Sequence, residues 1–264
     1  MPTVPAITES RPTRRIVTIG AVSFLNSRPL LEGLIDVPGV RVRTAVPAAL
    51  PGALARGEVD VAQLPIVDVW RGGQSLTIVS DACIASEAET LTVRVFSRVP
   101  PDRVTRLVAD PDSHTSVVLA QVLWRELYGR QLVLRPPGPE ADGADAVLLI
   151  GDKVVTDAPR GFGFEVDLGG AWRHLTGLPF VFAIWAGAAD RDWSELAAAL
   201  SHCRDRGVSR AAEIAESAGP EHGWPVPLAR RYLCQTLRYT LTPDMRSGMA
   251  RFFDLATRHR LLPR

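Results

Sequence analysis

The sequence contains few cysteines and almost no lysine. Its three cysteines, Cys83, Cys203 and Cys234, are widely spaced, odd in number and form no Cys-x-x-Cys pair. Because disulfide frameworks and zinc sites need paired or clustered cysteines, the sequence predicts neither of them, and we expect a reducing compartment. Lys153 is the only lysine among 30 basic residues, so a catalytic lysine would have to be Lys153.

Long hydrophobic runs are also absent. No segment approaches the ~20 consecutive apolar residues of a membrane-spanning helix. Residues 1–15 contain prolines and arginines but no apolar core of the kind that a secretory signal needs. We therefore expect a short disordered tail over 1–15, no membrane partner and a cytoplasmic protein. The net charge of +1 argues against nucleic acid as a partner, so any anion site must be local.

The first part of the chain alternates between predicted strands and helices. With 264 residues, 46% of them hydrophobic, the chain is long enough for one large domain or two lobes. Strands are predicted at 16–22, 40–46, 57–64 and 76–80, and helices at 29–34, 47–56 and from Pro65 through Trp70. This alternation with short loops is typical of a parallel sheet covered on both faces.

The alternation restarts after residue 100. Strands are predicted at 104–109, 131–135 and 146–150, with a helix at 113–128. The last third is helical, with segments at 192–206, 209–217, 225–240 and 243–259, the last capped by Thr242. Because strands near 93–97 and 177–184 connect the two halves, we predict two α/β lobes with a ligand cleft between them. Lobe I is expected to consist of 16–93 and 181–264, and lobe II of 94–180.

Polar residues follow the first strand of each predicted lobe. Ser23, Asn26 and Ser27, with the aromatic Phe24 between them, come after the strand 16–22, and Ser113, His114, Thr115 and Ser116 come after the strand 104–109. A helix that starts at the carboxyl edge of a strand presents unpaired N–H groups, and open α/β sheets bind anions there. Two such helix starts could hold a ligand with two carboxylates. The alternative is that these residues only cap their helices.

Further candidates come from other strand ends. Gly151 and Asp152 follow the buried strand 146–150, where pocket residues gather, although a simple turn explains them equally well. Thr90 and Thr92 lie on the strand that leaves the first lobe and could reach the cleft, although threonine is common in strands for its β-propensity alone.

Charged side chains and histidines give weaker signals. Arg28 and Arg94 could bind a substrate carboxylate through paired hydrogen bonds. His114 could be a general base, but its position equally suits a surface histidine. The histidines show no metal-ligand spacing, and no phosphate-binding glycine loop follows a predicted strand. The sequence therefore predicts neither a metal site nor a nucleotide site.

Four stretches together resemble the chorismate dehydratases of the futalosine route to menaquinone. They are Ser23–Leu30, Ser113–Val117 with Leu119–Gln121, Leu149–Asp152, and Asp167–Gly169 followed by Trp172 and Thr176–Ala183. The resemblance implies an α/β fold like the two-lobed type II periplasmic binding proteins. It also implies loss of water from chorismate to give 3-[(1-carboxyvinyl)oxy]benzoate, with no cofactor and no metal.

The resemblance also implies roles for individual residues. Asn26 is expected to be the catalytic residue and to orient the substrate near its departing hydroxyl, while the enolpyruvyl carboxylate of the substrate accepts the proton. Where many relatives have arginine this chain has His114, which favours backbone N–H groups, Thr115 and Ser116 as the anion holders. The expected substrate-binding residues are Ser23, Phe24, Ser27, Thr92, Ser113, His114, Thr115, Ser116, Gly151 and Asp152.

Two alternatives share the architecture. One is a solute-binding protein for a small carboxylate, which would leave its ligand unchanged. The other is the sister enzyme of the same pathway, the dihydroxynaphthoate synthase. That enzyme carries a Ser-Pro-Cys-Pro-Asn type stretch near its start, and the stretch 23–27 of this chain does not match it. The sequence leaves the oligomeric state open.

Overall fold

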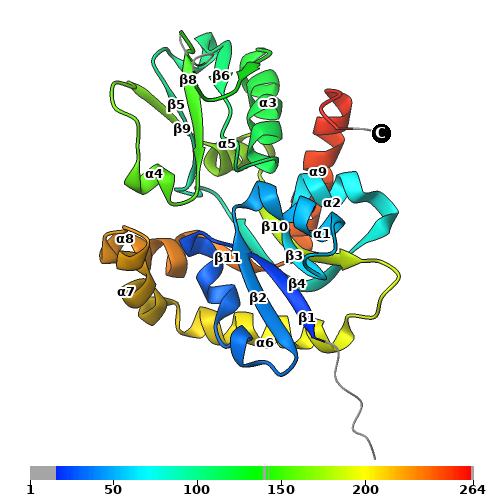
Figure 1. Cartoon of the computed structure of the whole chain (residues 1–264). Helices are drawn as coiled ribbons and strands as arrows, with labels where there is room; N and C mark the ends of the chain where they lie inside the picture. The colour runs from blue at the N-terminus through cyan, green and yellow to red at the C-terminus, as the bar shows by residue number, and fades with distance from the viewer. Residues whose placement is uncertain (1–15, 139–140, 142, 263–264) are drawn as a thin grey trace, which may run out of the picture.

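The computed structural model describes residues 16–138, 141 and 143–262, so the predicted tail over 1–15 lies outside it. Each of the two lobes is built around a sheet of its own, and the lobes lie one above the other in Figure 1. The chain enters lobe II between β4 and β5 and returns to lobe I between α5 and β10. Within the described residues, no helix has the length and apolarity needed to cross a membrane.

Lobe I contains a six-stranded mixed sheet in the order β11-β4-β10-β3-β1-β2. The strands are β1 (Val17–Val22), β2 (Val40–Ala45), β3 (Val61–Pro65), β4 (Leu76–Ser86), β10 (Phe180–Ala188) and β11 (Leu237–Thr240). The prediction of a parallel sheet holds for β2, β1 and β3 only. It is wrong for the other half, because β10 returns from lobe II and runs antiparallel to both β3 and β4.

Helices surround this sheet. They are α1 (Leu50–Ala55), α2 (Ile66–Gly72), α6 (Ser194–Ser209), α7 (Ala211–Glu221), α8 (Val226–Arg231) and α9 (Pro243–Arg258), with 3-10 turns η1 (Leu25–Leu31), η2 (Leu34–Asp36), η3 (Pro47–Ala49) and η4 (Gly73–Ser75). The α9 cap is confirmed, since the Thr242 hydroxyl accepts from Met245 N at 3.3 Å. The helix predicted at 29–34 is instead the 3-10 turn η1, which starts at Leu25 and lacks a side-chain cap.

The helix predicted over 225–240 is wrong in its second half. The α-helix stops at Arg231 and continues as a π-helical turn, η7 (Tyr232–Thr236). The chain then becomes β11, which pairs with β4 at the edge of the sheet. Residues 237–240 alternate between buried and more exposed positions, as expected of an edge strand. Pairing with a strand more than 150 positions earlier has replaced the local helical preference.

Lobe II contains a five-stranded sheet in the order β7-β6-β8-β5-β9. The strands are β5 (Val93–Ser97), β6 (Arg106–Val108), β7 (Val133–Arg135), β8 (Ala146–Ile150) and β9 (Phe164–Asp167). The helical elements are η5 (Pro101–Arg103), α3 (Thr115–Tyr128), α4 (Lys153–Thr156) and α5 (Leu168–Thr176). The sequence reasoning missed β9 and α5, because β9 is a short strand with no fully buried residue.

One hydrophobic core joins the two lobes. It includes Leu148 of lobe II as well as Phe180 and Phe252 of lobe I. The Trp172 ring of α5 contacts the rings of Phe180 and Phe252, with centroid distances of 5.4 and 6.1 Å. Helix α9, which carries Phe252, therefore packs against both lobes, and Figure 1 shows it running alongside α2 toward α3.

Candidate active site between the lobes

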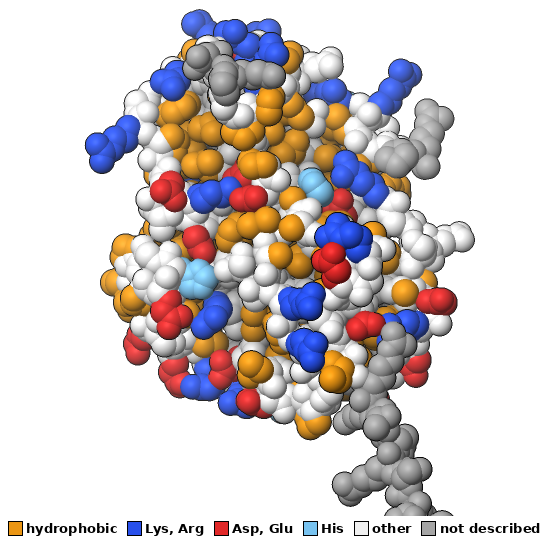
Figure 2. Space-filling model, in the orientation of Figure 1, with side chains coloured by type: hydrophobic (Ala, Val, Ile, Leu, Met, Phe, Trp, Pro, Cys, Tyr) orange, Lys and Arg blue, Asp and Glu red, His pale blue; other side chains and the backbone are white. Residues whose placement is uncertain are grey.

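A cavity lined by residues of both lobes lies between them. Figure 2 shows hydrophobic side chains exposed along the line where the lobes meet. Among the described residues, no charged side chain lines the cavity. Its polar lining consists of Asn26, Thr90, Thr92, Ser113, Thr115, Ser116 and Tyr232.

The turn after β1 positions Asn26, which is the only asparagine of the chain. Gln63 of β3 holds this turn, since its Oε1 accepts from Val22 N at 2.7 Å and from Ser27 Oγ at 2.6 Å. The Asn26 side chain lines the cavity, and its Oδ1 is buried without a hydrogen-bond partner among the described residues. A buried acceptor without a donor is costly, so this atom is suited to a ligand hydroxyl.

The N-terminus of α3 reaches the cavity from lobe II. The Ser113 Oγ caps the helix by accepting from Ser116 N at 3.1 Å, and Thr115 Oγ1 accepts from Val67 N at 3.4 Å. All three hydroxyl-bearing residues line the cavity, where the positive end of the helix dipole favours an anion. The capping alternative and the binding hypothesis are therefore compatible for Ser113.

Tyr232 also lines the cavity and was not found by sequence reasoning. The π-helical turn places it in the cavity wall, where its OH lies 2.6 Å from Thr92 Oγ1. Burial raises the pKa of Tyr232, and this effect outweighs its hydrogen bonds with Thr92 and Asn26, which act in the opposite direction. Tyr232 therefore remains a neutral phenol. The local sequence did not indicate Tyr232 as a site residue, because it lies within the segment 225–240 that was predicted to be a helix.

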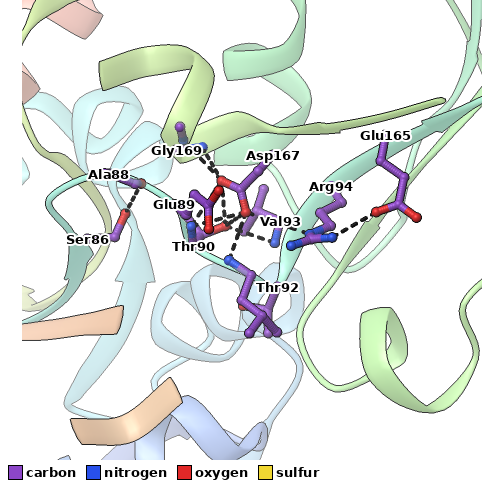
Figure 3. A network of polar contacts seen from close by, with 12 residues as sticks. Ser86, Ala88, Glu89, Thr90, Thr92, Val93, Arg94, Glu165, Asp167 and Gly169 are labelled. Atoms are coloured by element: carbon purple, nitrogen blue, oxygen red, sulfur yellow. Dashed lines mark hydrogen bonds and ion pairs between the residues drawn. The ribbon is translucent and has the colours of Figure 1, made fainter. Parts of the chain in front are cut away.

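Asp167 fixes the segment that carries Thr90 and Thr92 (Figure 3). Its carboxylate accepts from Thr90 N at 2.9 Å and from Leu91 N at 2.8 Å, and it also caps α5 through Gly169 N at 3.0 Å. Figure 3 shows Arg94 beside this cluster, where it pairs with Glu165 at 2.8 Å. Arg94 therefore faces these carboxylates and does not line the cavity.

Gly151 lines the cavity, and its backbone conformation and its contact with Phe24 require glycine at this position. Its φ is +65°, and a Cβ at this position would lie 2.5 Å from Cδ2 of Phe24. The Phe24 ring of lobe I therefore packs directly on the backbone of lobe II. Any larger residue at position 151 would displace that ring.

Four of the predicted substrate-binding residues do not line the cavity. They are Ser23, Ser27, His114 and Asp152. Ser27 is fully buried against Gln63, whereas the His114 ring pairs through Nδ1 with Asp68 Oδ2 at 2.8 Å. The carboxylate of Asp152 is occupied by donors from lobe I. Arg28 is also absent from the lining, because it pairs with Glu221 at 3.6 Å.

Lys153 forms ion pairs and does not line the cavity. Its Nζ lies 2.7 Å from both Asp110 Oδ1 and Asp112 Oδ2, and the other Asp110 oxygen accepts from Ile150 N at 2.9 Å. Burial alone would lower the pKa of Lys153, but its hydrogen bonds and charge interactions with Asp110 and Asp112 raise it above the ordinary 10.5. Lys153 is therefore a cation at neutral pH and cannot act as a base or nucleophile.

We expect Lys153→Met to lower the free energy of unfolding by about 1–3 kcal/mol, because the buried carboxylate of Asp110 loses its counter-charge. The pKa is raised in the folded state, so the stabilisation from Lys153 is complete below its unfolded pKa and is lost only as the pH rises through the folded value. Urea unfolding across roughly pH 6 to 9 should show a constant difference in the free energy of unfolding between the wild type and Lys153→Met. The control is Arg160→Met, at an exposed cation of the same lobe; equal stability of the two variants would contradict the prediction.

No group of three or more His, Cys, Asp or Glu side chains in the described part of the chain is arranged to hold a metal ion. The site thus offers neutral hydroxyls, one carboxamide, helix N–H groups and apolar walls. Such a lining can hold and orient a small organic anion.

Two α/β lobes around such a cavity define the class of proteins with the periplasmic-binding-protein fold. A solved protein from Archaeoglobus fulgidus matches with a TM-score of 0.72 and 14% identity, over 96% of this chain and 100% of that one. The alkanesulfonate-binding protein SsuA from Xanthomonas axonopodis pv. citri, bound to MOPS, matches with a TM-score of 0.64 and 13% identity, over 94% of each chain. These similarities confirm the predicted fold.

Within this class, the chain belongs to the menaquinone biosynthesis family, whose family model matches residues 17–258. A chorismate dehydratase from Thermus thermophilus is 31% identical over 259 residues, which cover 91% of this chain and 95% of that protein. The family expected from the four matching stretches is thereby confirmed.

Proposed function

We propose that the protein is a chorismate dehydratase, a hydro-lyase that converts chorismate to 3-[(1-carboxyvinyl)oxy]benzoate and water. The observation that carries the proposal is the convergence of three family-like stretches on one cavity. Asn26, Ser116 and Gly151, from stretches far apart in the sequence, all line it. The related enzyme from Thermus thermophilus supports the same activity, and the menaquinone biosynthesis family supports a cytoplasmic location.

The chemistry requires little from the protein beyond orientation. As the ring C–H bond breaks, its electron pair forms a new ring double bond while the neighbouring C–O bond breaks and hydroxide departs. The enolpyruvyl carboxylate of the substrate accepts the proton, which combines with the hydroxide as water. Because the product ring is aromatic, much of the driving force belongs to the substrate, and the enzyme contributes positioning and charge stabilisation.

The cavity residues suit this division of work. Asn26 offers its unpartnered Oδ1 to the departing hydroxyl and thus orients it, while its amide group hydrogen-bonds Tyr232. Thr115, Ser116 and the N-terminus of α3 offer hydrogen bonds and a positive dipole to a carboxylate. Tyr232 and Thr92 add a neutral hydrogen-bonding pair to the cavity lining.

Incubation of the purified protein with chorismate tests the proposal. We expect the ultraviolet spectrum to show a new aromatic product and mass spectrometry to show a small molecule lighter by one water. Addition of a metal chelator should leave the rate unchanged. If chorismate stayed intact but raised the melting temperature, the site would bind without catalysis, as in a solute-binding protein. If chorismate had neither effect, the proposed function would be wrong.

A further inference from the structure

One carboxylate of lobe II accepts hydrogen bonds from three residues of lobe I. Asp152 follows β8, and both of its oxygens lie 3.2 Å from the backbone N of Leu25. Its Oδ1 also accepts from Trp224 Nε1 at 3.0 Å, and its Oδ2 lies 2.8 Å from His222 Nδ1. The Asp152 side chain is 17% exposed, so these contacts are largely shielded from solvent.

Two partners of Asp152 are in contact with, or adjacent in sequence to, residues that line the cavity. Leu25 immediately precedes Asn26, so the hydrogen bond at Leu25 N fixes the turn that presents the Asn26 side chain. The Trp224 indole stacks on the Tyr232 ring, with centroids 4.8 Å apart and an angle of 17° between the planes. Through the single carboxylate of Asp152, lobe II thus contacts Leu25, which positions Asn26, and Trp224, which stacks on Tyr232.

Other polar contacts between the lobes lie away from these supports. His114 pairs with Asp68 of α2, and Ala48 N donates to Asp112 O at 3.1 Å. Val67 N donates to Thr115 Oγ1, and Arg125 Nη1 donates to His259 O at 2.6 Å. None of these four contacts involves η1 or the segment around Tyr232. Asp152 is therefore placed to couple lobe closure to the arrangement of the cavity residues.

We infer that Asp152 is a positioning residue that latches the lobes together over the substrate and, in doing so, sets the positions of Asn26 and Tyr232. This inference rests on the proposed function for its substrate, chorismate. Donors from lobe I can reach the carboxylate only when the lobes are together, so the hydrogen bonds stabilise the closed form alone. If a ligand binds only the closed form, its apparent Kd rises by the same factor by which the population of the closed form falls.

The test is Asp152→Asn, which preserves size but turns an N–H₂ group toward hydrogen-bond donors. We expect KM for chorismate to rise about tenfold while kcat changes by less than about threefold, because saturating substrate restores the closed form. The matched control is Asp157→Asn, five positions further on in the same lobe, whose exposed carboxylate accepts from the neighbouring Thr156 hydroxyl. A KM equal to that of the control, or a loss confined to kcat, would overturn the inference.

Two measurements on the free protein separate this inference from the proposed function. Amide hydrogen exchange at Leu25 should be faster in Asp152→Asn than in Asp157→Asn, and the radius of gyration from X-ray scattering should be larger. Neither measurement needs turnover, so both decide the inference even if the wild-type protein leaves chorismate intact. Unchanged exchange and radius would show that Asp152 does not latch the lobes.

A second variant covers the case in which Asp152→Asn fails to fold. Trp224→Phe removes the indole N–H donor and keeps a ring to stack on Tyr232. We expect a smaller rise in KM from this variant alone, which needs no folded Asp152→Asn. Where Asp152→Asn folds, the double variant should show no further rise, because Asp152→Asn already affects the contact with Trp224. Independent, additive effects would show that Trp224 does not act through Asp152.

Discussion

Asn26→Ala should fold normally and lose about 100-fold to 1000-fold in kcat, the range observed when one positioned hydrogen-bonding group is removed from an active site. The loss should fall on kcat because the carboxylate contacts proposed for the N-terminus of α3 do not involve Asn26 and should still bind the substrate. Steady-state kinetics with chorismate measure the effect, and circular dichroism confirms the fold. Asn26→Asp should be equally slow and should also raise KM, since a carboxylate in a cavity without cations repels a dianion.

The control for Asn26 is Gln74→Ala, which removes a carboxamide from an exposed position of η4. We expect its kcat and KM to equal those of the wild type. If Asn26→Ala retained the activity of this control, Asn26 would have no part in the mechanism, although the cavity and the fold would be unaffected.

Gly207→Ala should destabilise the protein by about 3 kcal/mol, the upper part of the range for overpacked sites. A Cβ at Gly207 of α6 would lie 1.8 Å from the carbonyl oxygen of Pro29 in η1, so the helix and the turn would have to separate. Because η1 also carries Asn26, we expect kcat to fall as well. Urea unfolding measures the first effect and chorismate turnover the second.

The comparison for Gly207 is Gly170→Ala in α5. The nearest atom to a Cβ at Gly170 is Glu89 Cγ at 3.5 Å, which is ordinary contact, and alanine favours a helix over glycine. This variant should be as stable as the wild type or slightly more so. Similar stability for Gly207→Ala would mean that α6 and η1 have room that the structure does not show.

Local patterns in the sequence predicted much of the secondary structure. Thr242 and Pro243 mark the start of α9 because a cap and a proline act within one helical turn. The strand β11 was missed because it exists through pairing with β4, whose residues are far away in the sequence. The direction of β10 was missed for a related reason, since only the path of the chain through lobe II determines it.

In the candidate site, too, local sequence patterns pointed to some residues, whereas contacts between distant parts of the chain determine the others. Ser113 and Gly151 follow β6 and β8, which are parallel neighbours in the sheet of lobe II, so the sequence made both of them candidates at one sheet edge. Asn26 follows β1 in the other sheet, and it was expected to join them only through the predicted cleft between the lobes. The orientation of Asp152 could not be predicted, because its partner Leu25 lies 127 positions earlier. Tyr232 reaches the cavity only through a π-helical turn, which no propensity of its residues announces.

The position of α9 has a consequence for synthesis of the protein. This helix follows all the other described elements in chain order, yet Met245 and Phe252 complete the core to which Leu148 of lobe II and Val67 of lobe I belong. Until it emerges, apolar surfaces of both lobes stay uncovered. The two sheets therefore cannot mature one after the other as independent domains, and the nascent chain depends on α9 to finish both.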